Sequence, residues 1–220
     1  MALPMLLSLT ALAREPAPAP WVDDSFSRLK ALALLQSLNA DLLSHPSATL
    51  TLERWCGTHR LAPEAKIVAH RIKGDDKPLP DGAREQLAIG IDEPVRYRRV
   101  QLVCGERVLS EADNWYVPAR LTDDMNRQLD HSDVPFGRVV QALKFRRQTL
   151  SAELLWSPLP EGWEMSGILP PATGRALAVP EQVLRHRALL YTQDNQPFSL
   201  VVETYTSGVL AFEPDHIRLP

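Results

Sequence analysis

The stretch from Arg96 to Pro118, RYRRVQLVCGERVLSEADNWYVP, constrains the fold of this chain more than any other part. Its first half alternates with the two-residue period of an extended strand. One face of that strand carries Arg98, Val100, Leu102 and Cys104. Gly105-Glu106 is a natural turn, after which a second strand returns and ends at the proline. We therefore predict a β-hairpin at the centre of a sheet, whose inward arginines need a carboxylate or phosphate partner.

Elsewhere the spacing of apolar residues predicts several further elements. Leucines at helical spacing predict a helix from about Ser25 to Leu43, capped by Asp23 or Asp24 and covering one face of the sheet. The alternation in ATLTLERW predicts a strand from Ala48 to Trp55, while residues 62–72 suit a helix or a strand and stay unassigned. Short helices are expected at 83–88, 122–129 and 137–142, further strands at 148–156, 184–191 and 198–205, and an irregular surface excursion at 158–171. Strands with segregated helices indicate an α+β fold with a mainly antiparallel sheet.

Length and charge narrow the classes of protein to consider. A chain of 220 residues with 45% apolar residues suits a single domain, here expected over residues 21–220. Residues 1–20, with an apolar run and a PAPAP segment, are expected to be a flexible or cleaved extension. We favour a cytoplasmic location without stable membrane insertion, a signal peptide at residues 1–13 being the alternative. A net charge of −3 supplies no electrostatic footprint for nucleic acid.

Motifs for several kinds of chemistry are missing from the sequence. It contains no GxGxxG, Walker loop, HExxH or GxSxG, so nucleotide, zinc-peptidase and serine-hydrolase functions lack their minimum parts. Cys56 and Cys104 lack zinc-ligand spacing and are interpreted as two buried small apolar residues. The scattered histidines, including His186, suit structural or solvent-facing roles. No metal or organic cofactor is expected.

Glu203 stands out because it falls inside the apolar run SLVVETY. A carboxylate there is costly unless a cation matches it or it is held protonated. Alternation places Glu203 on one face with Val201 and Tyr205. If that face meets the Arg99 side of the hairpin, the two residues form a pocket with one fixed cation and one titratable acid. A buried ion pair without a ligand, or an exposed edge strand, is the simpler interpretation.

Three separated pieces resemble the chorismate pyruvate-lyase family and the related ligand-binding domains of one class of transcription regulators. They are the hairpin YRRVQLVCGERVLSEADNWYVP, the segment VPFGRVV and the strand QPFSLVVETY. The resemblance implies an α+β fold with a mainly antiparallel six-stranded sheet and helices packed on it. It also implies elimination of pyruvate from chorismate to give 4-hydroxybenzoate, the head-group precursor of ubiquinone, without a cofactor.

The resemblance also implies roles for particular residues. Arg99 would anchor the carboxylate of the ring, and Glu203 would act as an acid, base or hydrogen-bonding group at the far side. Backbone amides at Phe136 or Gly137 would add a contact, and by position Arg187 would bind the second carboxylate. The segment Asp113-Asn114-Trp115 departs from the small residues of the familiar lyases and changes the polarity or shape of the pocket wall.

The sequence leaves other functions open. A non-catalytic protein of the same fold that binds an aromatic or cyclohexadiene carboxylate is the main alternative to the lyase. The related regulators carry an N-terminal winged helix-turn-helix module, and the residues before the hairpin contain no basic recognition helix. We therefore expect an enzyme, with a monomer slightly favoured over an oligomer.

Overall fold

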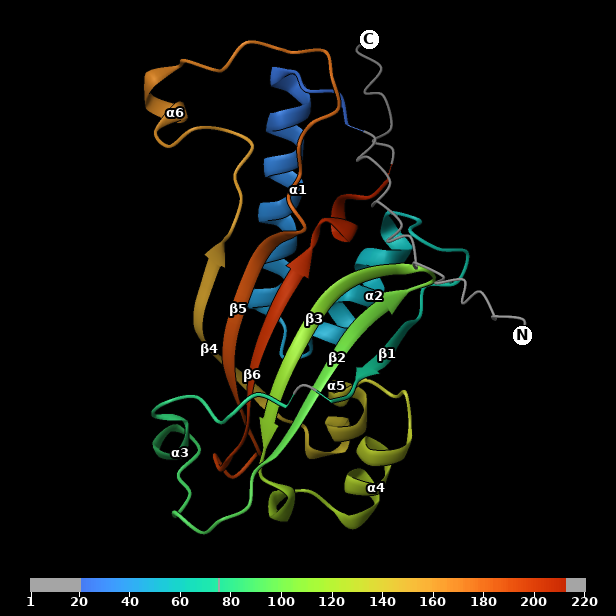
Figure 1. Ribbon diagram of the computed structural model, residues 1–220, viewed down its shortest axis with the longest axis vertical. Coiled ribbons are helices and arrows are strands. Elements are labelled where there is room, and N and C mark those ends of the chain that lie inside the picture. Colours follow the sequence, from blue (N-terminus) through green and yellow to red (C-terminus); the bar gives the residue numbers. More distant parts are fainter. Residues whose placement is uncertain (1–20, 75, 213–220) are drawn as a thin grey trace, which may run out of the picture.

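One six-stranded antiparallel sheet occupies the middle of the computed structural model, which describes residues 21–74 and 76–212 (Figure 1). The strands lie in the order β1-β2-β3-β6-β5-β4, and every neighbouring pair is antiparallel. The strands are β1 Ile67–Ile72, β2 Arg96–Cys104, β3 Arg107–Tyr116, β4 Arg146–Leu154, β5 Gln182–Tyr191 and β6 Pro197–Thr206. The α+β fold with a six-stranded antiparallel sheet is confirmed. The expected extension at residues 1–20 lies outside the described residues.

The central hairpin forms as predicted, and its register fixes two faces of the sheet. Arg98 on β2 pairs with Asn114 on β3, which pairs with Val201 on β6. Paired residues in adjacent strands share a face, so these three side chains lie together. We call this the inner face. Arg99 pairs with Asp113, so it lies on the opposite, outer face.

Two helices cover the upper part of the inner face. Helix α1, Ser25–Ser44, begins at Asp24, whose side chain accepts a hydrogen bond from the Ser27 amide at 2.7 Å. Leu35, Leu38 and Leu42 are fully buried and pack with inner-face residues of the sheet. Burial of each leucine contributes about 1.5–3 kcal/mol. The predicted helix over one face of the sheet is therefore confirmed.

Helix α2, Ala48–Thr58, occupies the stretch for which the sequence predicted a strand, and that prediction is wrong. The Ser47 side chain caps the helix by accepting from the Leu50 amide. Leu52, Trp55 and Cys56 are buried at helical spacing, and this packing overrides the alternation of threonine and leucine. The unassigned stretch that follows contains the edge strand β1.

A disulfide joins Cys56 of α2 to Cys104 at the end of β2, with 6.4 Å between the two Cα atoms. Both cysteines are fully buried, as predicted, but their interpretation as separate apolar residues is wrong. The bond fixes α2 across the inner face of β2.

Shorter helices complete the lower part of the molecule. Inner-face residues there pack against α4, α5 and the turn that follows, while α3 and its flanking loops cover part of the outer face (Figure 1). The helices expected at 83–88, 122–129 and 137–142 are confirmed within a few residues. Their bounds are α3 Ala83–Gln86, α4 Asp123–His131 and α5 Phe136–Val139, with 3₁₀ turns η1 Pro118–Arg120, η2 Val140–Leu143 and η3 Ser207–Leu210.

The segment between β4 and β5 loops away from the sheet and passes the N-terminal end of α1 (Figure 1). It contains one short helix, α6 Trp163–Ser166, and is largely exposed, as predicted. The buried Arg28 attaches it to α1 by donating to the carbonyls of Pro170 at 2.6 Å and Pro171 at 3.2 Å. None of the helices in residues 21–74 and 76–212 is both long and apolar enough to cross a membrane.

Candidate ligand-binding cavity

A cavity of about 50 Å³ lies between the inner face of the sheet, the N-terminal end of α2, and α5. Its walls are mainly apolar, with Val100 and Leu102 from β2, Val201 from β6, Phe136 from α5 and Phe145 from the residue before β4. Its charged lining residues are Arg98, Arg147 and Glu203. Two guanidinium groups therefore face one carboxylate, and the lining carries one excess positive charge.

Arg98 is 3% exposed and supplies this excess charge. Its Nη2 donates to the carbonyls of Ser132 at 3.4 Å and Val134 at 3.3 Å, and its buried Nε has no partner among the described residues. No carboxylate in the described part of the chain forms an ion pair with it. Burial, and then the charge of Arg71, lower the pKa of Arg98 to about 10. At neutral pH Arg98 is thus a protonated and largely desolvated cation, and no counter-ion contacts it within residues 21–74 and 76–212.

Asn114 lies beside Arg98 in the same row of the inner face. Its Oδ1 accepts a hydrogen bond of 2.6 Å from the hydroxyl of Ser199, and both residues are buried. This bond fixes the orientation of the amide. The Asn114 amide nitrogen donates to no group among the described residues, so its N–H groups are the end left for the cavity.

A second charged group stands farther along the inner face. Arg147 of β4 contacts Oε2 of Glu203 on β6 at 2.6 Å, and the two side chains are 5% and 10% exposed. The Tyr205 hydroxyl donates to the same oxygen at 3.2 Å, and burial raises the pKa of Tyr205. Burial alone would lower the pKa of Arg147, but the charge of Glu203 raises it. Oε1 of Glu203 accepts no hydrogen bond from the described residues, so it can accept one from a ligand.

Residues at the starts of two helices close the cavity. Ser47, Ala48 and Thr49 at the start of α2 line it, and the first amides of a helix have no partner within the helix. No acidic residue lies in the first turn of α2 to offset the partial positive charge there. Gly137 of α5 packs closely, because a Cβ at this position would lie 3.0 Å from Ser47 Oγ and 3.3 Å from Thr49 Oγ1. The lining thus combines a cation, a side-chain amide and the start of a helix, a combination that suits an anion.

His186 is a buried neighbour of Glu203 that does not belong to the lining of this cavity. It pairs with Glu203 in the sheet, its Nε2 lies 2.8 Å from Asn39 Oδ1, and its buried Nδ1 has no partner among the described residues. Burial lowers the pKa of His186 to about 4, so it is neutral at physiological pH. Of the structural and solvent-facing roles that the sequence left open, burial excludes the solvent-facing one for His186.

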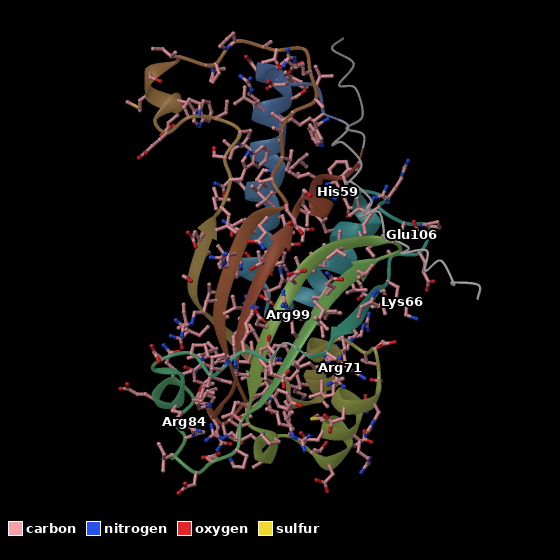
Figure 2. The ribbon with its side chains drawn as sticks, viewed as in Figure 1. His59, Lys66, Arg71, Arg84, Arg99 and Glu106 are labelled. Atoms are coloured by element: carbon pink, nitrogen blue, oxygen red, sulfur yellow. A yellow bond between two sulfur atoms is a disulfide. The ribbon has the colours of Figure 1, made fainter. Side chains whose placement is uncertain are left out.

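The structure separates the predicted site residues. Glu203, Phe136 and Gly137 line the cavity, but the prediction that Arg99 faces the same cavity is wrong. Arg99, labelled near the middle of the sheet in Figure 2, lies on the outer face, with Glu111 Oε2 at 3.3 Å and Asp113 Oδ1 at 3.9 Å. Arg187 also lies on the outer face and donates to Gln86 Oε1 at 2.9 Å.

Sequence reasoning gave no site role to Arg98 or Arg147, and it placed Asn114 only within the segment 113–115 of the pocket wall. The sequence carries a signal for Arg98, because it alternates with the apolar Val100 and Leu102 and so belongs to the inward face of the strand. Nothing local signals Arg147, whose strand is mostly exposed. Among the described residues, no group of three or more His, Cys, Asp or Glu side chains is arranged to hold a metal ion.

The chain is 56% identical over 193 residues to the uncharacterized protein y4mC of Sinorhizobium fredii, a match that covers 87% of this chain and 81% of that protein. The chain therefore belongs to the same family as y4mC. No family model matches the sequence.

Two solved structures have a partly similar arrangement. PhnF from Mycobacterium smegmatis is 13% identical, with a TM-score of 0.49 over 79% of this chain and 70% of that one. A transcriptional regulator of the GntR family from Enterococcus faecalis is 14% identical, with a TM-score of 0.40 over 66% of this chain and 96% of that one.

Proposed function

We propose that this protein binds a small monoanionic carboxylic acid in the cavity between the sheet, α2 and α5. The observation that carries the proposal is Arg98, a buried guanidinium with an unpartnered Nε and no ion pair among the described residues. A desolvated cation is costly by itself, and an anionic ligand would supply the missing charge. Asn114 and the first amides of α2 and α5 add neutral donors around it.

The charge of the lining limits the ligand to one negative charge. Arg147 and Glu203 neutralise each other, so Arg98 alone remains to be compensated. A monocarboxylate matches this balance, whereas a dicarboxylate leaves one buried charge unpaired.

The shape of the lining favours a ligand with an apolar body and a hydroxyl group. Apolar side chains separate Arg98 from Glu203, whose free Oε1 can accept a hydrogen bond from a hydroxyl. The cavity of about 50 Å³ is smaller than the roughly 150 Å³ that holds a benzene ring in an engineered protein core. Compact acids fit without rearrangement, while an aromatic acid such as 4-hydroxybenzoate requires the cavity to widen.

Two adjacent arginines provide the test. Calorimetric titration with 4-hydroxybenzoate and with propionate would compare wild type, Arg98→Met and Arg99→Met. We expect Arg98→Met to weaken binding by about 2–5 kcal/mol, because it removes one partner of a buried charge pair. Arg99→Met is the matched control, with the same substitution one residue away on the outer face.

Folding of the Arg98 variant is checked by its melting temperature. Removal of a buried charge that has no counter-ion should leave stability unchanged or raised. Unchanged affinity in a folded Arg98→Met protein, or equal losses in both variants, would contradict the proposal.

A lyase acting on chorismate is the second candidate. In its favour, the carboxylate of Glu203 and the cation of Arg98 line one cavity, so an anchor and an acid or base are both present. Against it, chorismate carries two carboxylates, whereas Arg98 is the one charged lining residue without a carboxylate partner among the described residues. In this reaction the bond between the ring carbon and the enolpyruvyl oxygen breaks, and the ring loses a proton to become 4-hydroxybenzoate. The released enolpyruvate takes up a proton at its methylene carbon to become pyruvate.

The lyase candidate has a direct test. Purified protein is incubated with chorismate, and both products are measured by chromatography. Turnover that falls in Glu203→Gln but persists in Glu111→Gln, a matched change on the outer face, supports the lyase. No product at high protein concentration leaves the binding function as the better account.

A further inference from the structure

We propose that Asn114 determines the specificity of this cavity, by donating its amide hydrogens to the anionic oxygen that Arg98 binds and so selecting a carboxylate over its neutral isosteres. The inference rests on the proposed function and assigns a role that the charge of Arg98 alone does not provide. It is carried by the position of Asn114 and by the bond that orients its side chain.

The position of Asn114 follows from the register of three strands. Asn114 is the direct neighbour of Arg98 on β2 and of Val201 on β6, and all three line the cavity. Neighbours in such a row have Cβ atoms about 4.5–5.5 Å apart. One carboxylate can therefore contact the guanidinium and the amide together.

The orientation of the amide is set by Ser199. The Ser199 hydroxyl is fully buried and donates to Asn114 Oδ1 at 2.6 Å. A hydroxyl that donates needs an acceptor, so it favours the amide oxygen over the amide nitrogen at that position. The NH₂ end is thereby presented to the cavity, where it finds no acceptor among the described residues.

The direction of hydrogen bonding explains why Asn114 beside Arg98 would select a carboxylate. An amide that can only donate suits a carboxylate oxygen, which can only accept. A neutral carboxamide ligand has an oxygen at one end and an NH₂ group at the other. In one of its two orientations the NH₂ group would face the Asn114 donors or the Arg98 cation. In either orientation the charge of Arg98 would stay uncompensated. Aspartate at position 114 reverses this logic. It still accepts from Ser199, but it provides Arg98 with a counter-ion and removes the donors.

The experiment varies the charge of the side chain at position 114 and the charge of the ligand. Benzoate and benzamide are titrated into wild type and Asn114→Asp at pH 7. Both probes carry the same ring, so the cost of widening the cavity cancels in the ratio of their affinities. We expect wild type to prefer benzoate. In Asn114→Asp, benzoate affinity should fall on the order of 100-fold, while benzamide binds as well as or better than in wild type.

Two further variants separate positioning from folding. Ser199→Ala frees the amide to rotate, so the ratio of benzoate to benzamide affinity should shrink while the protein remains folded. Gln148→Glu is the charge control, because it adds the same negative charge at an exposed position of β4 and should leave the ratio unchanged. Asn114→Asp should melt at or above the wild-type temperature, since the new carboxylate pairs with Arg98.

The outcomes distinguish this inference from the proposed function. If wild type binds benzoate, Arg98→Met loses it, and Asn114→Asp keeps the wild-type ratio, the role of Asn114 is overturned while the anion site stands. If wild type binds no carboxylate, the proposed function falls and this inference falls with it. A ratio that collapses equally in Gln148→Glu would also overturn the inference, because net charge would then account for it.

Discussion

Arg98 and Arg99 are consecutive residues of one strand, yet they belong to two different regions of the molecule. Arg98 lies on the inner face, is almost completely buried, and has only two carbonyl oxygens as partners among the described residues. Arg99 lies on the outer face with its side chain 22% exposed, between Glu111 and Asp113. On the inner face the arginine side chain is a buried cation that is costly by itself and suits an anionic ligand. On the outer face the same type of side chain belongs to a partly solvated network of charges. The alternation of Arg98 with Val100 and Leu102 assigns it to the apolar face of the strand. Only the layers packed on each face make Arg98 a buried cation and leave Arg99 among carboxylates.

The largest effect should come from the disulfide that fixes α2 to the inner face. The bonded cysteines are separated by 48 residues in sequence, and closing a loop of this length stabilises the folded state by about 4 kcal/mol. We expect dithiothreitol to lower the free energy of unfolding by that amount and to weaken carboxylate binding, because α2 supplies part of the cavity. Denaturant titration would measure the first effect and calorimetry the second. A Cys56→Ser, Cys104→Ser double variant should show no further response to reductant.

A somewhat smaller loss should follow from breaking the buried ion pair of the inner face. Glu203→Gln leaves Arg147 charged and buried, which we expect to lower the free energy of unfolding by roughly 3 kcal/mol. This is the low end of the usual range, because glutamine can still accept from Arg147 and Tyr205. Urea unfolding followed by circular dichroism would measure it. A loss below about 1 kcal/mol would mean that water reaches the pair and that the inner face is not as dry as its burial indicates.

The inner face should also respond to acid through His186. Its pKa is lowered to about 4 from an ordinary 6.5, so the folded state resists a proton that the unfolded state accepts. The stabilisation is complete above pH 6.5 and is lost as the pH falls towards about 4. We expect His186 to account for roughly 1–2 kcal/mol of the stability lost between pH 6.5 and 5.

The acid response can be assigned to one residue by substitution. His186→Gln should remove that part of the pH dependence, measured by urea unfolding at both pH values. Glu203, Arg147 and Tyr205 also face this position, so an unchanged slope in the variant would assign the effect to them instead.

The smallest effect should come from the ion pair of the outer face. Arg99 and Glu111 are 22% and 25% exposed, and pairs of this kind contribute about 0–1 kcal/mol. Glu111→Gln is the same chemical change as Glu203→Gln, so the two variants compare the faces directly. We expect less than about 1 kcal/mol, reduced further by salt. A loss as large as that of Glu203→Gln would remove the distinction between the two regions.

Much of the fold could be predicted from local sequence. The hairpin of β2 and β3, the capped helix α1 and the pair β5 and β6 each have a clear period and a turn or cap of the right residue type. Helix α2 could not, because ATLTLERW alternates like a strand, and only burial of Leu52, Trp55 and Cys56 on one side favours the helix. The disulfide was not predictable either, since its two cysteines meet only when α2 crosses β2.

The candidate site was also predicted only in part. Glu203 was found because a carboxylate in an apolar strand needs a partner, and its partner proved to be Arg147 rather than Arg99. That partner lies on an exposed edge strand, two strands away in the sheet. No local pattern reports such a pairing.

By itself the sequence determined that this chain forms an α+β fold around a central hairpin, and that a buried glutamate on its last strand needs a cation. A two-residue period and a lone carboxylate among apolar residues are local facts with direct physical consequences. Only the tertiary structure decided that the cavity lies on the face of Arg98 and not on the face of Arg99, because helices packed there enclose it and successive side chains of a strand point to opposite faces. The helices packed on the inner face then made Arg98 a buried cation, while the outer face left Arg99 among carboxylates.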